Sequence, residues 1–189
     1  MRTRPLISAL GLTALAALAL GTAPAAPDPS GAPRDDDATV RADLARAYRA
    51  TAKYHSVERA VADGYKPMRG CIDRPEGGMG YHYVNTARNN STDPAKPAAL
   101  MYEDTGNGGK RLVGIEFFVE DRDQKVATDD DRPTMFGQPF LGPTPGVEAG
   151  VKVHYDLHVW IYKHNPKGMF TEWNPNVRCP AAAAGSHTG

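Results

Sequence analysis

Residues 151–163 read VKVHYDLHVWIYK, and this stretch decides the fold. An apolar or aromatic side chain stands at every second position from Val151 to Ile161, which is the period of a β-strand with one buried face. The intervening positions carry a different set of side chains: Lys152, His154, Asp156, His158, Trp160 and Tyr162. The stretch therefore predicts a strand with one apolar face and one face rich in polar and ionisable groups.

Similar alternation recurs earlier in the chain, in short runs separated by Gly, Pro, Asn and Asp. We expect further strands near residues 80–85, 98–103 and 111–120. Residues 105–109 (TGNGG) connect the last two runs, because Gly and Asn tolerate the positive φ angles of a hairpin turn. This pattern is typical of an antiparallel sheet.

A helix is predicted from Ala38 to Asp63, ahead of the strands. Its apolar side chains recur every three or four residues and so form one buried stripe. The stripe consists of Val40, Leu44, Ala47, Tyr48, Thr51, Tyr54, Val57 and Val61. Gly64 stands where a helix stop belongs, and Pro67 prevents continuation. The predicted fold class is α+β: a long N-terminal helix packed on a curled antiparallel sheet or a small open β-barrel.

The N-terminus has the charged-then-apolar order of a secretory signal. Arg2 and Arg4 precede an apolar run over residues 6–20, and small residues at 23–25 predict cleavage after Ala25. The run is shorter than the roughly 20 residues that a membrane-spanning helix needs. We therefore expect a secreted, extracellular protein with no membrane span.

Composition predicts how the chain is divided. Residues 1–25 form the signal peptide, and residues 26–37, which contain Pro, Gly and three consecutive Asp, form a flexible leader. Residues 38–179 are long enough for a single domain with its own core. Residues 180–189 have the composition of a disordered tail.

Charge and cysteine content narrow the class of partner and the compartment. Lys plus Arg equals Asp plus Glu at 22 each, so no basic field favours nucleic acid or an anionic membrane surface. The two cysteines are Cys71 and Cys179, and in an exported chain they favour a disulfide. Thiol metal ligands are the less favoured alternative, because neither cysteine has a second Cys or His nearby.

The strand faces opposite the apolar rows carry the candidate site. Glu116 shares its predicted face with Leu112 and Phe118, which is an unusual place for a carboxylate needed only for solubility. His82 stands two residues after Gly80, and Glu116 likewise follows a glycine, so each has a neighbour without a side chain. Such positions leave room for a ligand.

His82, Glu116 and His158 are therefore the candidate metal ligands, one from each of three strands. Two histidines and one carboxylate hold a divalent transition metal such as zinc, iron, copper or manganese and leave coordination positions open. His154 stands four residues before His158, about 13 Å along a strand, so we assign only His158 as a ligand. His154 and Asp156 are candidate partners that support a ligand from behind. Trp160 and Phe118 are the expected pocket walls.

The same residues are also compatible with purely structural roles. The histidines fit a solvated sheet face, and Glu116 fits a structural ion pair with Arg111. The aspartates at positions 121, 123 and 129–131 favour a solvated loop over a calcium site, because the glycine of a calcium loop is missing. Three functions follow: an exported metal-site protein, acting as a metal-dependent enzyme on a small molecule; a metal-free module that binds a small organic ligand; or a structural exported protein.

Four short motifs carry a resemblance. They are MGYHY at 79–83, LVGIE at 112–116, LHVW at 157–160 and NPKGMF at 165–170, followed by Asn174-Pro175. With these motifs the chain resembles a family of exported bacterial proteins of no established activity, and the resemblance covers most of the expected domain. It implies export but names no substrate or cofactor, so the site is argued from the residues themselves.

Overall fold

The computed structural model describes residues 35–68, 70–146 and 151–180. The predicted signal peptide, the leader up to residue 34 and the predicted tail from residue 181 lie outside these ranges. The last residues of the predicted leader already belong to a helix, α1 (Asp35–Thr51). Within the described ranges, no helix combines the length and the apolar character needed to cross a membrane.

The predicted helix over residues 38–63 is divided into three helical segments. After α1 come a 3₁₀ turn, η1 (Ala52–His55), and a second helix, α2 (Val57–Ala62). Ser56 has an extended backbone between them, and its hydroxyl accepts a hydrogen bond from Arg59 N at 3.2 Å, which caps the start of α2. One uninterrupted long helix is therefore not confirmed, whereas the stop is: Gly64 adopts a φ of 92° after α2.

The division of the helix also changes its buried stripe. Ala47, Thr51 and Tyr54 are buried as predicted, but Tyr48 is 49% exposed and Val61 51% exposed. The extended residue at position 56 resets the phase of the helix, so a stripe counted across the break does not stay on one side. The prediction of a buried Val61 was wrong for this reason. The prediction of a buried Tyr48 was wrong within α1 itself, where the neighbouring Ala47 is the residue that faces the core.

The described strands form one open antiparallel sheet and a small separate ribbon. In the described part of the chain, seven strands make the sheet. Six of them follow the order β1-β3-β4-β5-β9-β8, and β2 pairs with the first residues of β3, from Gly77 to Gly80. The sheet is not closed into a barrel. Its members are β1 (Lys66–Pro67), β2 (Ile72–Arg74), β3 (Gly77–Val84), β4 (Ala99–Asp104), β5 (Lys110–Glu120), β8 (Leu141–Thr144) and β9 (His154–Val159). The short 3₁₀ turn η2 (Thr86–Arg88) follows β3, and β6 (Thr134–Met135) pairs with β7 (Gln138–Pro139).

The four predicted strands correspond to β3, β4, β5 and β9, and the predicted hairpin turn joins β4 to β5. Thr105 N donates to Gly109 O at 3.0 Å across that turn. The strand predicted over 151–163 is shorter at both ends, since β9 spans His154–Val159. At its C-terminal end Trp160 N donates to Met169 O at 2.9 Å instead of continuing the ladder.

A bulge in β5 exchanges the faces of two side chains. Met101 pairs with Gly114 and Tyr102 with Leu112, so Val113 is an extra residue between the two pairs. Leu112 consequently packs with the helix-side core, and Val113 with the opposite side. Leu112 therefore does not share a face with Glu116, contrary to the expectation from strict alternation.

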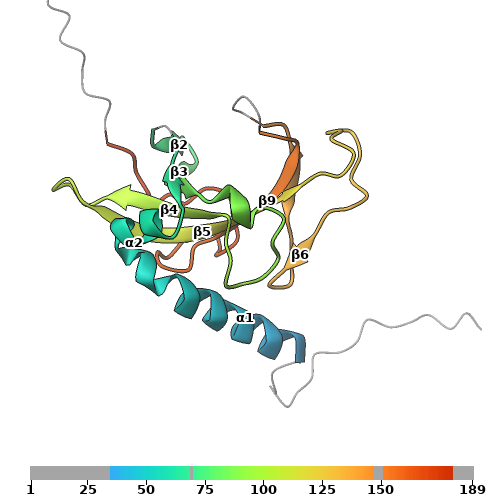
Figure 1. Cartoon of the computed structure of the whole chain (residues 1–189), viewed down its shortest axis with the longest axis horizontal. Coiled ribbons are helices and arrows are strands. Elements are labelled where there is room, and N and C mark those ends of the chain that lie inside the picture. The colour runs from blue at the N-terminus through green and yellow to red at the C-terminus, as the bar shows by residue number, and fades with distance from the viewer. Residues whose placement is uncertain (1–34, 69, 147–150, 181–189) are drawn as a thin grey trace, which may run out of the picture. The chain divides into compact units, whose positions relative to one another are not determined.

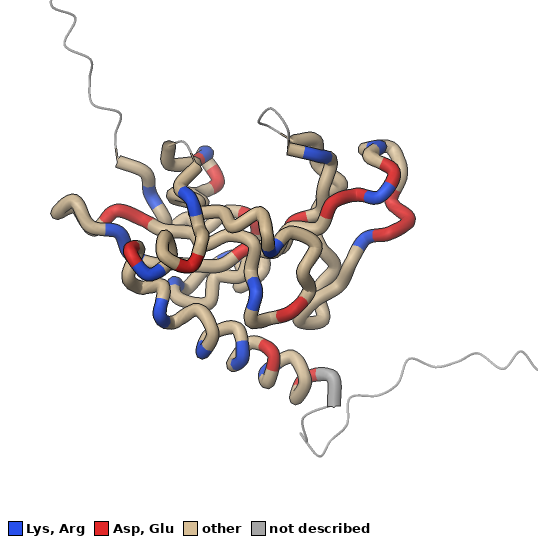
Figure 2. Tube along the Cα trace, in the orientation of Figure 1, with Lys and Arg blue, Asp and Glu red and all other residues tan. Residues whose placement is uncertain are grey.

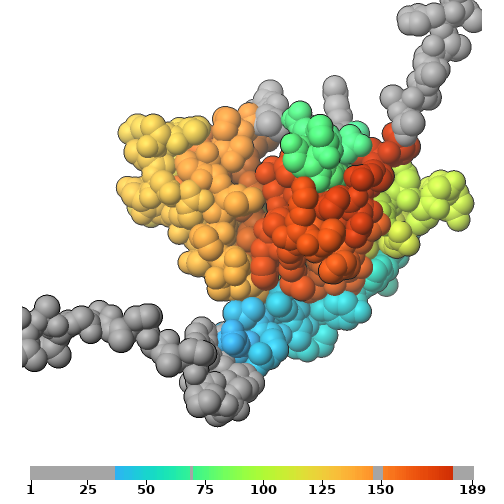
Figure 3. Space-filling model, turned by 180° about the vertical axis from the view of Figure 1, so that it is seen from behind, coloured from blue at the N-terminus to red at the C-terminus, as the bar shows by residue number. Residues whose placement is uncertain are grey.

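The two faces of the sheet have different covers. On one face the helices pack against a large apolar cluster that includes Ala47, Tyr54, Leu100 and Phe117 (Figure 1). On the other face a smaller cluster joins Val177, from the segment after β9, to Met101 and Val113 of the sheet and to Trp160, the residue directly after β9. Figure 3, seen from behind, shows this orange-red segment beside the green residues of β2 and β3.

The predicted disulfide is confirmed. Cys71 and Cys179 are bonded, with Cα atoms 5.6 Å apart and a separation of 108 positions in sequence. The bond ties the segment after β9 to the residue before β2. Loop closure over so long a separation is the case in which a disulfide constrains the unfolded chain most.

Candidate metal centre

Three strands bring His82, Glu116 and His158 to the same place. His82 lies in β3, Glu116 in β5 and His158 in β9, and Glu116 and His158 are direct partners in the β5–β9 register. All three are buried, with exposed fractions of 5%, 5% and 2%. A pair of ionisable residues on neighbouring strands of a buried face is expensive unless the groups serve one another or a ligand.

One donor atom from each of the three side chains lies within 4.8 Å of the others. His82 Nε2 is 3.5 Å from Glu116 Oε2, and His158 Nε2 is 3.6 Å from Glu116 Oε1. The carboxylate thus stands between the two imidazoles, with one oxygen toward each. The structure brings together all three residues that the sequence predicted as ligands.

Several buried polar atoms of this cluster have no hydrogen-bond partner within the described residues. They are Nδ1 of His82, both ring nitrogens of His158 and Oδ1 of Asp156. A buried donor or acceptor left without a partner costs about 1–3 kcal/mol. The concentration of such atoms in one place distinguishes this cluster from an ordinary buried ion pair.

Burial and mutual charge shift the three pKa values in different directions. Burial lowers the pKa of His82 to about 3, and the charge of His158 acts in the same direction. Burial raises the pKa of Glu116, while the neighbouring His158 opposes that shift. Burial alone would lower the pKa of His158, but the carboxylates of Glu116 and Asp156 outweigh it and raise that pKa. Without a bound ion, burial therefore favours a neutral His82, whereas the two neighbouring carboxylates favour a protonated His158.

The two predicted supporting residues differ in position. Asp156 Oδ1 lies 3.2 Å from His158 Nδ1, close enough for an ion pair but not aligned for a hydrogen bond. His154 instead stacks on Phe118, with ring centroids 4.0 Å apart, and its Nδ1 lies 2.7 Å from Lys152 O. Asp156 is therefore beside the cluster, whereas His154 is engaged elsewhere.

The space that the sequence analysis expected beside Gly80 and Gly114 is occupied by other parts of the protein. Trp160 is buried, and its ring lies 6.4 Å from that of His158 in a stacked orientation. A side chain at Gly114 would meet Met101 Cε at 2.6 Å, and one at Gly80 would meet the carbonyl of Tyr102. These glycines allow close packing of the chain, so the expectation that they leave room for a ligand was wrong.

Arg111 does not pair with Glu116, which was the structural alternative for that carboxylate. Its guanidinium instead binds Glu103, which also receives Lys163 Nζ. Burial between two histidines rather than beside an arginine leaves Glu116 available to a cation.

Glu172 was missed by the sequence analysis. It lies in the segment after β9, and its charge acts on both Glu116 and His158. No periodic pattern points to it; the one signal was a lone carboxylate between Phe170 and Trp173, flanked by two Asn-Pro pairs.

No protein-family model, curated protein or solved structure matches the chain. The motif resemblance therefore stays a prediction, and the function has to be argued from the geometry of the cluster.

The aspartate-rich loop after β5 is held by ion pairs. Asp123 lies near Lys125, Asp129 binds Arg132 at 2.8 Å, and Asp131 lies 3.7 Å from Arg122. Figure 2 shows the alternation of acidic and basic residues along this loop. The arrangement favours the polar loop over a calcium site.

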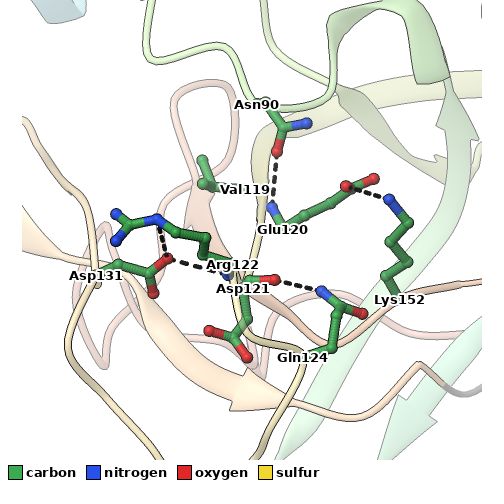
Figure 4. Close-up of a pocket in the computed structure, with 8 residues that line it drawn as sticks. All are labelled: Asn90, Val119, Glu120, Asp121, Arg122, Gln124, Asp131 and Lys152. Carbon is green, nitrogen blue, oxygen red and sulfur yellow. Dashed lines mark hydrogen bonds and ion pairs between the residues drawn. The ribbon is translucent and has the colours of Figure 1, made fainter.

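A cavity of about 410 Å³ opens beside the same loop (Figure 4). It is lined by Asn90, Val119, Glu120, Asp121, Arg122, Gln124, Asp131 and Lys152. None of the three clustered residues lines it. Because its two basic side chains already pair with Asp131 and Glu120, we place the chemistry at the buried cluster rather than here.

Proposed function

We propose that this is an exported protein that binds one divalent transition metal through His82, Glu116 and His158. The observation that carries the proposal is the convergence of three buried donor groups within 4.8 Å, where three of the four imidazole nitrogens have no hydrogen-bond partner among the described residues. Export is supported by the secretory pattern of the N-terminus and by the disulfide, which is the form cysteines take in oxidising compartments.

The donor distances suit a common ion after small movements of the side chains. Metal–ligand bonds of about 2.0–2.2 Å place two donors on one ion roughly 3–4 Å apart. The two distances from the histidine nitrogens to the Glu116 oxygens, 3.5 and 3.6 Å, already lie in this range. The donor atoms of His82 and His158 lie within 4.8 Å of each other, so they would have to move slightly closer. An ion between the two imidazoles and the carboxylate would give His158 Nε2, which has no hydrogen-bond partner among the described residues, a ligand bond.

Three protein ligands are the number found in catalytic rather than structural sites, and this ligand count is the basis on which we propose a metal-dependent enzyme. In that role the ion supplies Lewis-acid or redox chemistry. Asp156, 3.2 Å from His158 Nδ1, orients that ring and raises the basicity of its other nitrogen.

Elemental analysis of the untagged protein tests the proposal. We expect close to one transition-metal ion per chain in the wild type, and loss of that stoichiometry in His82→Ala and in His158→Ala. His164→Ala is the matched control, because His164 is exposed and only its backbone oxygen makes hydrogen bonds described by the structure.

Circular dichroism should show that the two variants keep their fold. Wild-type protein that carries no metal after exposure to zinc, iron, copper and manganese would overturn the metal assignment. The metal-free organic-ligand alternative would then be the one to test.

A further inference from the structure

Strand β4 lies between the two strands that carry His82 and Glu116. The sheet order places β3, β4 and β5 side by side. Neighbouring strands are about 4.8 Å apart, so β3 and β5 are separated by about twice that distance. His82 Nε2 nevertheless lies 3.5 Å from Glu116 Oε2. The two side chains therefore meet above β4, and the side chains that β4 presents on this face form the floor of the cluster.

The strand register identifies the floor residues as Ala99 and Met101. Ala99 is the cross-strand partner of Glu116 in β5, and Met101 is the cross-strand partner of His82 in β3. Directly opposite side chains of an antiparallel pair lie on one face, with Cβ atoms about 4.5–5.5 Å apart. Of the two floor residues, only Met101 carries an atom that can bind a metal ion, its thioether sulfur.

The side chain of Met101 extends along this floor from β4 toward β5. A Cβ at Gly114, which is the partner of Met101 in β5, would meet Met101 Cε at 2.6 Å and Trp160 Cε3 at 3.3 Å. The methyl end of Met101 thus lies over Gly114, beside the indole ring that stacks near His158. Because the sulfur is bonded to that methyl group, it lies on the face of the cluster, two residues from Glu116 along β5.

The segment after β9 crosses this face of the sheet and covers the floor methionine. Trp160 Nε1 donates to Thr171 O at 2.6 Å, which holds the first part of the segment. Farther along, Asn174 and Gly78 exchange two backbone hydrogen bonds, which attach the segment to β3. Val177 then packs in the same buried cluster as the methionine, whose side chain is fully buried. The sulfur is therefore kept away from water.

A buried thioether beside two imidazoles and a carboxylate changes which ion the site favours. Imidazole nitrogen suits zinc, iron and copper alike, whereas thioether sulfur is a soft ligand that selects cuprous copper. Zinc sites in proteins are built instead from Cys, His, Asp and Glu. Methionine is unbranched and has three rotatable bonds, so its sulfur can turn toward an ion without any change of the backbone.

We infer that Met101 Sδ is a further ligand of the ion, and that the site therefore favours copper over zinc, most strongly in the cuprous state. The inference rests on the proposed metal site and names the ion that it holds. Copper sites can keep a long, weak methionine bond beside three stronger ligands. His82, Glu116 and His158 accordingly remain the three strong ligands, and Met101 determines the specificity.

The test measures the affinity of the full chain for copper(I) and for zinc, each in competition with a chromophoric chelator. Ascorbate keeps the copper cuprous during its titration. The quantity compared is the ratio of the two dissociation constants, zinc over copper(I). A substitution that merely loosens the site weakens both affinities and leaves this ratio unchanged, whereas loss of a ligand that selects copper lowers it.

We expect Met101→Leu to lower the ratio at least about tenfold, because leucine has a similar volume but no sulfur. Met135→Leu is the matched control. Met135 is a buried methionine of the helix-side core, so the same substitution there should leave the ratio unchanged.

X-ray absorption at the copper edge tests the wild type directly and does not depend on the folding of a variant. We expect a sulfur neighbour of copper(I) in addition to nitrogen and oxygen. Cys71 and Cys179 are bonded to each other, so this sulfur should come from a methionine. The sulfur signal should be absent from Met101→Leu.

Each contrary outcome has its own meaning. Ratios within twofold of one another in the wild type and Met101→Leu would overturn the inference while the metal site stands. A copper spectrum without sulfur, or one in which the sulfur persists in Met101→Leu, would overturn it as well. The same holds if the wild type takes up zinc, iron or manganese but no copper. A wild type that takes up none of the four metals overturns the proposed function itself, and the inference with it.

Discussion

The two faces of the sheet bury side chains for different purposes. The helix-covered face contains a continuous apolar cluster, including Phe117, Leu100 and Tyr54, whose members are in contact with one another. The face under the C-terminal segment has a smaller apolar cluster and, beside it, the three buried ionisable groups. Glu116 and Phe117 are consecutive in β5 and both buried, so burial alone does not distinguish a stabilising residue from a functional one.

What distinguishes the two faces is whether each buried group has its partners. Apolar atoms on the helix side gain free energy from every contact. The His–Glu–His cluster instead retains polar atoms without partners among the described residues, which lowers the stability of the metal-free protein. One face therefore stabilises the fold through apolar contacts, and the other contains polar atoms that the proposed metal ion would partner.

The largest contrast should come from the two consecutive residues of β5. Phe117→Ala removes a fully buried ring from the helix-side core and should cost about 3–5 kcal/mol of unfolding free energy. Glu116→Gln should change the stability of the metal-free protein by less than about 1 kcal/mol, because His158 can lose its proton when the carboxylate is gone. Urea denaturation of both variants without metal measures the difference.

For metal binding, Glu116→Gln should have the larger effect and Phe117→Ala the smaller one. Glu116→Gln is expected to abolish stoichiometric metal uptake, whereas Phe117→Ala should still bind under conditions in which it is folded. Equal losses of stability in the two variants would show that the two faces do not have separate roles.

An intermediate effect is expected from the disulfide that fixes the cover of the site face. Replacing both Cys71 and Cys179 by alanine should cost about 2–4 kcal/mol, because the unfolded chain regains its loop entropy. It should also weaken metal binding, since Val177 lies two residues before Cys179 and packs with Trp160, whose ring stacks on that of His158. Denaturation curves and metal titration measure the two effects.

Mass spectrometry after alkylation supplies the control for the disulfide. The wild type should present no free thiol before reduction and two after it. Metal affinity that is unchanged in the double variant would show that the cover does not depend on this bond.

The smallest effects test the phase of the helical stripe. Leu44 is half-buried against the helix-side core, so Leu44→Ala should cost about 1–2 kcal/mol. Val61→Ala should change stability by less than about 0.5 kcal/mol, because Val61 is more than half exposed. Thermal unfolding compares the two. A larger loss of stability in Val61→Ala than in Leu44→Ala would indicate that Val61 faces the core, as it would if residues 38–63 formed one continuous helix.

The four central strands and the site could be predicted because they depend on local alternation. His82, Glu116 and His158 each occupy a polar position opposite an apolar row, and antiparallel neighbours bring such positions onto one face. Register decided which groups meet: the pairing of Glu116 with His158 excludes His154, which pairs with Glu120.

The errors arose where a single residue changed the local geometry. Ser56 ended the helical phase by capping α2, and the extra residue Val113 moved Leu112 to the other face. Neither event alters the hydrophobic pattern of its neighbours, so no periodic count could reveal it. Glu172 escaped prediction because a crossing segment is positioned by tertiary hydrogen bonds, here those of Asn174 with Gly78 and of Thr171 with Trp160.

The crossing segment also fixes when the site can form. It follows every described strand in the chain, so a ribosome or an export channel releases β3, β5 and β9 before the residues that cover them. During that interval the three ligands can meet while their face is still open to water. Metal capture can therefore precede closure, and the final step of folding then encloses an ion already bound.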